Sequence, residues 1–254
     1  AAVISGVATA SLTETNAILS TGGALSATDV DSSAAFVAQA GVAGSNGYGV
    51  FAVTTLGAWT YSTNTAHNEF VAGTNYTDSF TVATADGTTQ VVTVTIAGTN
   101  DAAVISGVAT ASLTETNAVL STSGALAATD VDSSAAFVAQ AGVAGSNGYG
   151  VFAVNTLGAW TYTTNTAHNE FVAGTNYTDS FTVATADGTT QVVTVTIAGT
   201  NDAAVISGVA TASLTETNAI LSTGGALSAT DVDSSAAFVA QAGVAGSNGY
   251  GVFA

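Results

Sequence analysis

Residues 90–98 read QVVTVTIAG, and this stretch decides the fold class of the chain. From Val92 to Ile96, apolar side chains alternate with threonines, so one face of the segment is apolar and the other is polar. A period of two residues is typical of a β-strand that rests one face on a core. The segment is therefore predicted to be a half-buried strand.

The residues that precede this stretch carry similar signals. Further strands are predicted at residues 2–14, 49–53, 58–62 and 79–83, with a hairpin turn at 54–57. The dipeptides Asn46-Gly47 and Asp86-Gly87 favour tight turns. Only residues 32–41, SSAAFVAQAG, could form a helix, and the short length and the Phe36-Val37 pair favour a strand there as well.

The whole pattern then repeats along the chain. Residues 2–101 recur as 103–202, and residues 204–254 begin a third copy. The first two copies differ at Ile18/Val119, Gly22/Ser123, Ser26/Ala127, Thr54/Asn155 and Ser62/Thr163. A unit of about 101 residues has the usual size of an independent domain, whereas solenoid repeats have about 20–50 residues.

We therefore predict an all-β chain of tandem immunoglobulin-like, Greek-key β-sandwich domains, each with six or seven short strands. The domains are predicted at residues 1–101 and 102–202. Residues 203–254 would be the N-terminal half of a third domain, which should not close a sandwich by itself.

The composition excludes several classes of function. The 254 residues include 17 Asp and Glu but no Lys, Arg, Cys, Met or Pro, and the formal net charge is −17. Binding to nucleic acid or to an anionic membrane surface needs cationic side chains. Without Cys there is no disulfide or thiolate metal site, and no apolar run reaches the roughly 18 residues of a membrane span. No signal peptide is visible, and we interpret the chain as an interior piece of a longer protein.

The acidic residues fall at predicted strand ends and loops. Asp29 and Asp31 are two residues apart and point to the same side if the chain is extended. A hard divalent cation with oxygen ligands would turn their repulsion into attraction, and the supply of carboxylates, amides and loop carbonyls favours Ca²⁺ over Zn²⁺. Asp86 is a further candidate ligand for the metal. The alternative for the Asp-x-Asp pair is a solvated turn edge, and the alternative for Asp86 is that it serves only to shape its turn.

Residues 91–106, VVTVTIAGTNDAAVIS, resemble the signature of VCBS repeats. Residues 27–33 (ATDVDSS), 48–61 (YGVFAVTTLGAWTY) and 77–87 (TDSFTVATADG) also resemble that family, in the family's order and over the whole repeating unit. The sequence departs from it at Ala102-Ala103, where the family commonly has Ala-Pro, which implies a less stiff linker. The resemblance implies a long, calcium-rich bacterial surface adhesin exported by type I secretion, often with RTX repeats, of which no nonapeptide occurs here.

The VCBS family is in turn similar to cadherin domains, whose calcium ions lie between consecutive domains. By motif, the resemblance implies a Ca²⁺ site formed by Glu14, Glu69, Asn100, Asp101, Asp130, Asp132 and Asp187. A second, incomplete site would use Glu115, Glu170, Asn201, Asp202, Asp231 and Asp233. Of these residues, Glu69 is aligned most loosely. Asp78 has no counterpart in the motif, and we interpret it as a residue at the surface or at the start of a strand.

Other candidate sites are weaker. His67 recurs as His168, so the chain offers one histidine environment, for which no role is expected. Trp59 and Tyr61 alternate on a predicted hairpin, which favours core packing over a platform for sugar binding. The sequence shows no convergent set of catalytic residues, and no enzymatic activity is expected.

The resemblance therefore predicts a structural extender of a secreted bacterial surface adhesin that supports cell adhesion or biofilm formation. Calcium between the copies would stiffen it, its main partners would be neighbouring copies of the same chain, and it would be an elongated monomer outside the cell. The alternative is that each copy binds a glycan or a protein through its loops, for which Tyr48 and Tyr76 are the best aromatic candidates.

Overall fold

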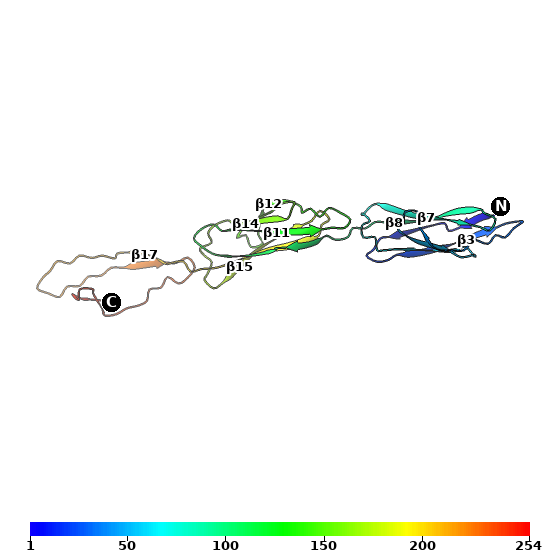
Figure 1. Ribbon diagram of the computed structural model, residues 1–254. Coiled ribbons are helices and arrows are strands. Elements are labelled where there is room, and N and C mark those ends of the chain that lie inside the picture. The colour runs from blue at the N-terminus through cyan, green and yellow to red at the C-terminus, as the bar shows by residue number, and fades with distance from the viewer. The chain divides into compact units, whose positions relative to one another are not determined.

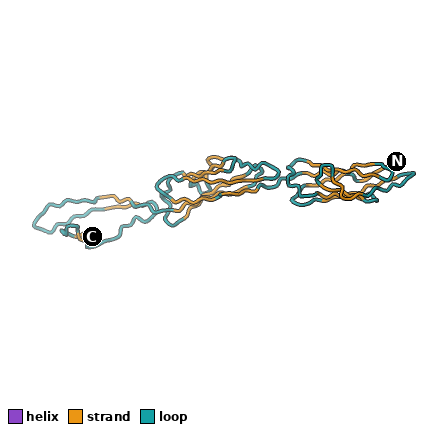
Figure 2. The backbone as a smooth tube through the Cα atoms, in the orientation of Figure 1, coloured by secondary structure: helices purple, strands orange, loops and turns teal.

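The computed structural model describes residues 1–254 and contains strands, turns and loops but no helix (Figures 1 and 2). Accordingly, no helix is long and apolar enough to cross a membrane. The chain divides into two compact units. The first comprises residues 1–106, 127–137 and 184–190, and the second comprises residues 107–126, 138–183 and 191–254.

Each of the first two copies has eight strands. Those of the first copy are β1 (Val3–Gly6), β2 (Thr9–Thr13), β3 (Ser20–Thr28), β4 (Gln39–Ala43), β5 (Gly49–Val53), β6 (Ala58–Thr63), β7 (Asn75–Ala83) and β8 (Thr89–Ala97). Those of the second copy are β9 (Val104–Gly107), β10 (Thr110–Thr114), β11 (Ser121–Thr129), β12 (Gln140–Ala144), β13 (Gly150–Val154), β14 (Ala159–Thr164), β15 (Asn176–Ala184) and β16 (Thr190–Ala198).

The strands of the first copy form two sheets, with orders β1-β3-β6-β5-β4 and β2-β8-β7. The second copy repeats both orders, as β9-β11-β14-β13-β12 and β10-β16-β15. The N-terminal strand is divided at Gly6, whose φ of 105° suits glycine. Its first part, β1, pairs antiparallel with β3, and its second part, β2, pairs parallel with β8.

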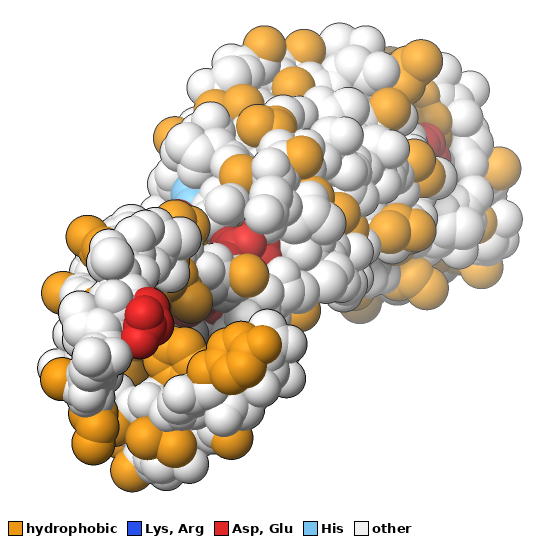
Figure 3. Space-filling model, turned by 90° about the vertical axis from the view of Figure 1, so that its left-hand side faces the viewer, with side chains coloured by type: hydrophobic (Ala, Val, Ile, Leu, Met, Phe, Trp, Pro, Cys, Tyr) orange, Lys and Arg blue, Asp and Glu red, His pale blue; other side chains and the backbone are white.

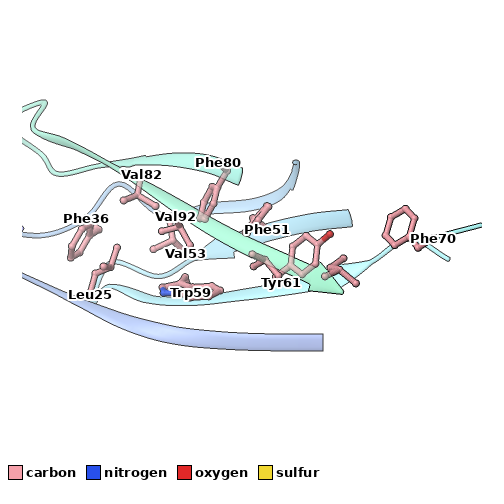
Figure 4. Packing of buried hydrophobic residues seen from close by; sticks show 12 residues of the cluster. Leu25, Phe36, Phe51, Val53, Trp59, Tyr61, Phe70, Phe80, Val82 and Val92 are labelled. Carbon is pink, nitrogen blue, oxygen red and sulfur yellow. The ribbon is translucent and has the colours of Figure 1, made fainter. Parts of the chain in front are cut away.

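The core of the first copy lies between its two sheets (Figure 4). The rings of Phe51 on β5 and Phe80 on β7 stack at 4.4 Å between their centres. Trp59 and Tyr61 are each 1% exposed, so the prediction that they pack in the core is confirmed. The apolar face of β8 is also buried, as its alternating sequence predicts. The predicted all-β sandwich is confirmed.

Three details of the strand prediction were wrong. The segment 32–38 is not a strand, and only Phe36 makes an isolated bridge, to Thr84. Residues 20–28, STGGALSAT, form β3 although their small side chains give little alternation. The copies have eight strands and not six or seven, because the N-terminal segment is shared between both sheets and β3 adds another.

The third copy is only partly ordered into strands. It contains β17 (Val205–Gly208), β18 (Leu227–Thr230), β19 (Val244–Ala245) and β20 (Val252–Phe253), in two separate pairs. Residues 203–254 have the same sequence as residues 1–52, yet Phe253 is 71% exposed while its counterpart Phe51 is 1% exposed. The same side chain loses its burial here because the strands equivalent to β6, β7 and β8 are not present to cover it.

Candidate functional site

Glu14 lies at the C-terminal end of the first sandwich. It follows β2, and because β2 runs parallel to β8, it sits beside the residues that follow β8. The Glu14 backbone N–H donates to the carbonyl of Ala97 at 2.8 Å, and the Thr99 hydroxyl donates to Glu14 Oε2. The side chain is 1% exposed, and its other oxygen, Oε1, is buried without a hydrogen-bond partner.

Asp29, Asp31 and Asp86 lie at the opposite, N-terminal end of the sandwich. Asp29 Oδ1 accepts the backbone N–H groups of Asp31 and Ser32, both at 3.0 Å, and these bonds lower the pKa of Asp29 to about 2. Asp86 accepts the Thr84 hydroxyl and the N–H of Ala2, the latter at 2.6 Å, and the pKa of Asp86 is held well below its usual range. Asp31 is exposed.

The first linker, residues 98–103, is held by acidic residues of the second copy, and these contacts lie within the first compact unit. The Asp101 N–H donates to Asp132 Oδ1 at 3.3 Å, and the Ala103 N–H donates to Asp187 Oδ2 at 2.9 Å. Asp132 is 8% exposed, whereas its counterpart Asp31 is exposed. The linker therefore changes the environment of this carboxylate.

The electrostatics of the loop at 130–133 follow from its hydrogen bonds. Burial raises the pKa of Asp132, and the neighbouring charges of Asp130 and Asp101 act in the same direction. Burial acts to raise the pKa of Asp130 too, but hydrogen bonds from Ser133 and Asp132 outweigh it and the pKa is lowered. Asp132 is thus the member of the pair that resists ionisation and would gain most from a nearby positive charge.

The second linker, residues 199–204, shows the same arrangement within the second compact unit. The Asp202 N–H donates to Asp233 Oδ1 at 3.3 Å, and Asp231 Oδ1 accepts the N–H of Asp233. Glu115, like Glu14, is 1% exposed and accepts a hydroxyl, here from Thr200. Asn100 and Asn201 donate to the carbonyls of Asp101 and Asp202, respectively.

Several carboxylate oxygens near the linkers are buried and unpartnered. They are Glu14 Oε1, Asp101 Oδ2 and Asp132 Oδ2 at the first linker, and Glu115 Oε1, Asp202 Oδ2 and Asp233 Oδ2 at the second. A buried charged oxygen without a donor is costly, and the chain has no Lys or Arg to supply one. Oxygens of this kind fit the ligand preference of Ca²⁺. However, no group of three or more acidic or histidine side chains is close enough to form a metal cage.

Glu69 and Glu170 are not gathered with these oxygens. The Glu69 side chain is 59% exposed, and its Oε1 lies 2.7 Å from His67 Nδ1, a contact that lowers the pKa of Glu69. Glu170 and His168 repeat this arrangement. His67 itself is buried in a left-handed conformation with φ 59°, and its Nε2 lies 2.7 Å from the carbonyl of Tyr48. The histidine thus joins two loops of the same copy.

Sequence reasoning missed the neighbouring Asn68. Its Oδ1 is buried without a hydrogen-bond partner, as is that of Asn169. An amide oxygen is a good ligand for a hard cation, but an asparagine in a loop carries no sequence signal that separates a ligand from a turn residue. Only the burial of its Oδ1 distinguishes Asn68 from an ordinary turn residue.

The interpretation of Asp78 as a surface residue was wrong. Asp78 is 0% exposed, and it accepts the N–H groups of Asn46 and Gly49 at 2.9 and 3.1 Å and the hydroxyl of Tyr61 at 3.2 Å. Burial raises the pKa of Tyr61, and the charge of Asp78 adds to the shift. Asp78 is therefore an internal carboxylate that orders the loop between β4 and β5.

The surface view agrees with the composition. In Figure 3 no Lys or Arg is seen, and the acidic side chains occupy small areas of a largely uncharged surface. Tyr48 and Tyr76, the aromatic candidates for ligand binding, both pack against Phe70, with Tyr76 stacked at 3.9 Å between ring centres. Both rings are partly buried against the core, so neither is a free platform.

The chain is similar to several solved cadherin structures. No curated protein matches the chain. Among solved structures, Drosophila N-cadherin EC1-4 is 17% identical, with 78% of this chain and 49% of that one covered, at a TM-score of 0.44. Mouse Cadherin-23 EC22-24 is 15% identical, with 77% and 64% covered, at a TM-score of 0.41. The chain spans about half the length of the first of these structures.

A family profile, described as the bacterial cadherin-like domain, matches residues 100–199. This range covers the second copy up to residue 199 together with the Asn100-Asp101 pair before it, and the first copy differs from the second at only five positions. The two complete copies are thus similar to bacterial cadherin-like domains.

Proposed function

We propose that this chain is an extender segment of a secreted bacterial surface adhesin. Its copies are near-identical, as expected of a spacer, which gains length by adding copies and does not depend on binding or catalytic residues that differ between them. We place the domains at residues 1–101 and 102–202, with 203–254 as the first half of a third, and the copies as VCBS repeats of a protein exported by type I secretion. The chain would act outside the cell, as a non-enzymatic monomer in adhesion or biofilm formation.

The proposal includes Ca²⁺ between consecutive copies, and one observation carries it. Glu14, Asp101 and Asp132 each have a buried oxygen without a partner at the first linker, in a chain that has no Lys or Arg. Bound there, Ca²⁺ would neutralise these oxygens and tie the linker to both copies. Asn100, Asp130 and Asp187 complete the proposed donor set, and Glu69, which is engaged by His67, lies outside it. The second linker would use the incomplete set Glu115, Asn201, Asp202, Asp231 and Asp233.

The test uses the full chain with calcium and then with a chelator. Calcium should bind with micromolar to millimolar affinity, raise the Tm, and change the maximal dimension measured by small-angle X-ray scattering. Isothermal titration gives the affinity directly. An identical Tm and scattering profile in calcium and in chelator would reject the calcium-stiffened extender.

A pair of variants separates the linker site from acidity in general. Asp132→Ala should weaken calcium binding at the first linker at least about tenfold while the copies stay folded. Asp31→Ala removes the equivalent, exposed carboxylate of the first copy and should leave that binding unchanged. An equal loss of calcium affinity in both variants would show that calcium binding depends on the net charge of the chain and not on this site.

The alternative is that each copy binds a glycan or a protein. Such a ligand would occupy a shallow hollow of about 400 Å³ on the first copy, lined in part by Gly22, Val50 and Thr60. The packing of Tyr48 and Tyr76 against Phe70 argues against an aromatic platform. Binding of the full chain to a glycan array, lost on Val50→Glu, would favour this alternative.

A further inference from the structure

Each complete copy contains one Asn-x-Thr triplet, Asn75-Tyr76-Thr77 and Asn176-Tyr177-Thr178. An asparagine two residues before a threonine is the acceptor motif of enzymes that attach sugars to asparagine. The other asparagines of the chain lack a serine or threonine at the second following position. The motif by itself is weak, so its place in the fold decides whether it can be used.

The triplet begins an edge strand in extended conformation. Asn75 is the first residue of β7, and β7 lies at the edge of the sheet β2-β8-β7. Residues two apart on a strand point to the same face, and both Asn75 and Thr77 are exposed. The carboxamide of Asn75 and the hydroxyl of Thr77, both of which a transferase must bind, therefore lie on the same exposed face of the strand.

The residue between them fixes this orientation. The ring of Tyr76 turns inward and stacks on Phe70, and its hydroxyl accepts the N–H of Val71 at 3.1 Å. The next residue, Asp78, is also fully buried. As a result, the exposed part of the triplet carries no charge that would repel a phosphorylated sugar donor.

Other asparagine side chains near this end of the copy are already engaged. The amide groups of Asn46, Asn64 and Asn100 donate to the carbonyls of Thr77, Gly47 and Asp101. Asn16 is exposed like Asn75, but Ala17 and Ile18 follow it, so it lacks the hydroxyl. Asn75 combines exposure with the full motif.

We propose that Asn75 and Asn176 are acceptor sites for an N-linked sugar. In the transfer, Asn75 Nδ2 forms a bond to the anomeric carbon of an activated glycosyl phosphate. The bond from that carbon to the phosphate oxygen breaks, the phosphate leaves with the bonding electrons, and a base of the transferase takes one amide proton. The inference does not depend on calcium or on the extender function.

The test measures the intact mass of the folded full chain after incubation with a sequon-specific N-glycosyltransferase and its nucleotide-sugar donor. Wild type should gain two sugars, Asn75→Gln and Thr77→Ala one each, and Asn75→Gln combined with Asn176→Gln none. Thr77→Ser keeps the hydroxyl and should still gain two. Circular dichroism of each variant verifies that it is folded.

Two results would overturn the proposal. One is a folded wild-type chain that gains no sugar while the heat-unfolded chain gains two, because the native edge strand would then hide the motif. The other is transfer to the double variant, because the acceptor would then lie elsewhere. As a positive control, Ile18→Thr completes a motif at the exposed Asn16 and should add a third sugar to an active reaction.

Discussion

Asp78 is the residue on which the interior of each copy depends most clearly. Its carboxylate receives three donors and is sealed from water, and a Cβ on Gly44 would lie 2.0 Å from it. Asp78→Ala leaves those donors unpaired, so it should lower the free energy of unfolding of the first copy by about 3 kcal/mol, and Tyr61→Phe by about 1 kcal/mol. Urea denaturation would measure both. A loss below that of Tyr61→Phe would contradict this role for Asp78.

Asp187 links stability to pH. Hydrogen bonds from the Thr185 hydroxyl and the Ala103 N–H hold the pKa of Asp187 below its unfolded value, so its ionised form stabilises the folded state. This contribution is complete above the unfolded pKa, near 4, and is lost as the pH falls toward the folded pKa. Urea midpoints measured from pH 6 to pH 2 should fall less steeply for Asp187→Asn than for wild type. A curve for Asp187→Asn that runs parallel to that of wild type would refute the linkage.

The sequence contained part of the information about these residues. Asp78 has the same parity as Phe80 and Val82, but the predicted strand began only at residue 79, and Asp78, which has no counterpart in the motif, was interpreted as a residue at the surface or at the start of a strand. The roles of Asp132 and Asp187 in holding the linker required knowledge of which loops meet, and spacing along the chain does not give that. Glu69 was assigned by motif, and only the structure shows its contact with His67.

At the scale of elements, the hairpin between β5 and β6 depends on Gly57. Its φ is 82°, and a Cβ there would lie 2.2 Å from the carbonyl oxygen of Leu25. Gly47 has a similar φ of 75° but no atom within 4 Å of the same position. Gly47→Ala should therefore cost about 1 kcal/mol of stability, and Gly57→Ala at least about 2 kcal/mol more. Thermal unfolding of the two variants checks the difference in stability. Equal losses of stability would mean that the backbone around Gly57 and Leu25 shifts at little cost to accommodate the added Cβ.

Elements with strong alternation were predicted well, and those without it were not. β5 and β8 were located within one residue because large apolar side chains mark their inward faces. β3 was missed because its sequence STGGALSAT offers only Leu25 as a buried anchor. The division of the N-terminal segment between β1 and β2 depends on pairing with two different partners, which a single segment cannot reveal.

At the scale of the whole molecule, one sequence occupies two environments. Residues 203–254 repeat residues 1–52, but Phe238 is 51% exposed and Tyr250 is 95% exposed, whereas Phe36 is 4% exposed. Chymotrypsin under native conditions should therefore cut after Phe238 and Tyr250 long before it cuts after Phe36. The masses of the fragments identify the sites. Simultaneous cleavage after Phe36 and Phe238 would show that the third copy is as protected as the first.

Near-identical copies could also exchange strands, and the first linker limits this. If β6 to β8 of the first copy paired instead with the beginning of the second copy, residues 98–103 would have to span the length of the sandwich. The six residues of that interval reach roughly 21 Å when fully extended, whereas a nine-residue strand such as β8 alone is about 30 Å long. The short linker thus favours pairing of each copy with itself.

The parallel pairing of β2 with β8 has a mechanical consequence. The chain enters each copy through its first strands and leaves through its last, and the register runs from Thr9 opposite Thr93 to Thr13 opposite Ala97. Tension applied at the two ends would pull these neighbours past one another along their length. The cross-strand bonds would then share the load and yield together rather than opening one at a time. Rupture under force would accordingly be governed by the rate of crossing that shear barrier, so a copy of modest thermodynamic stability could still withstand a brief, strong pull.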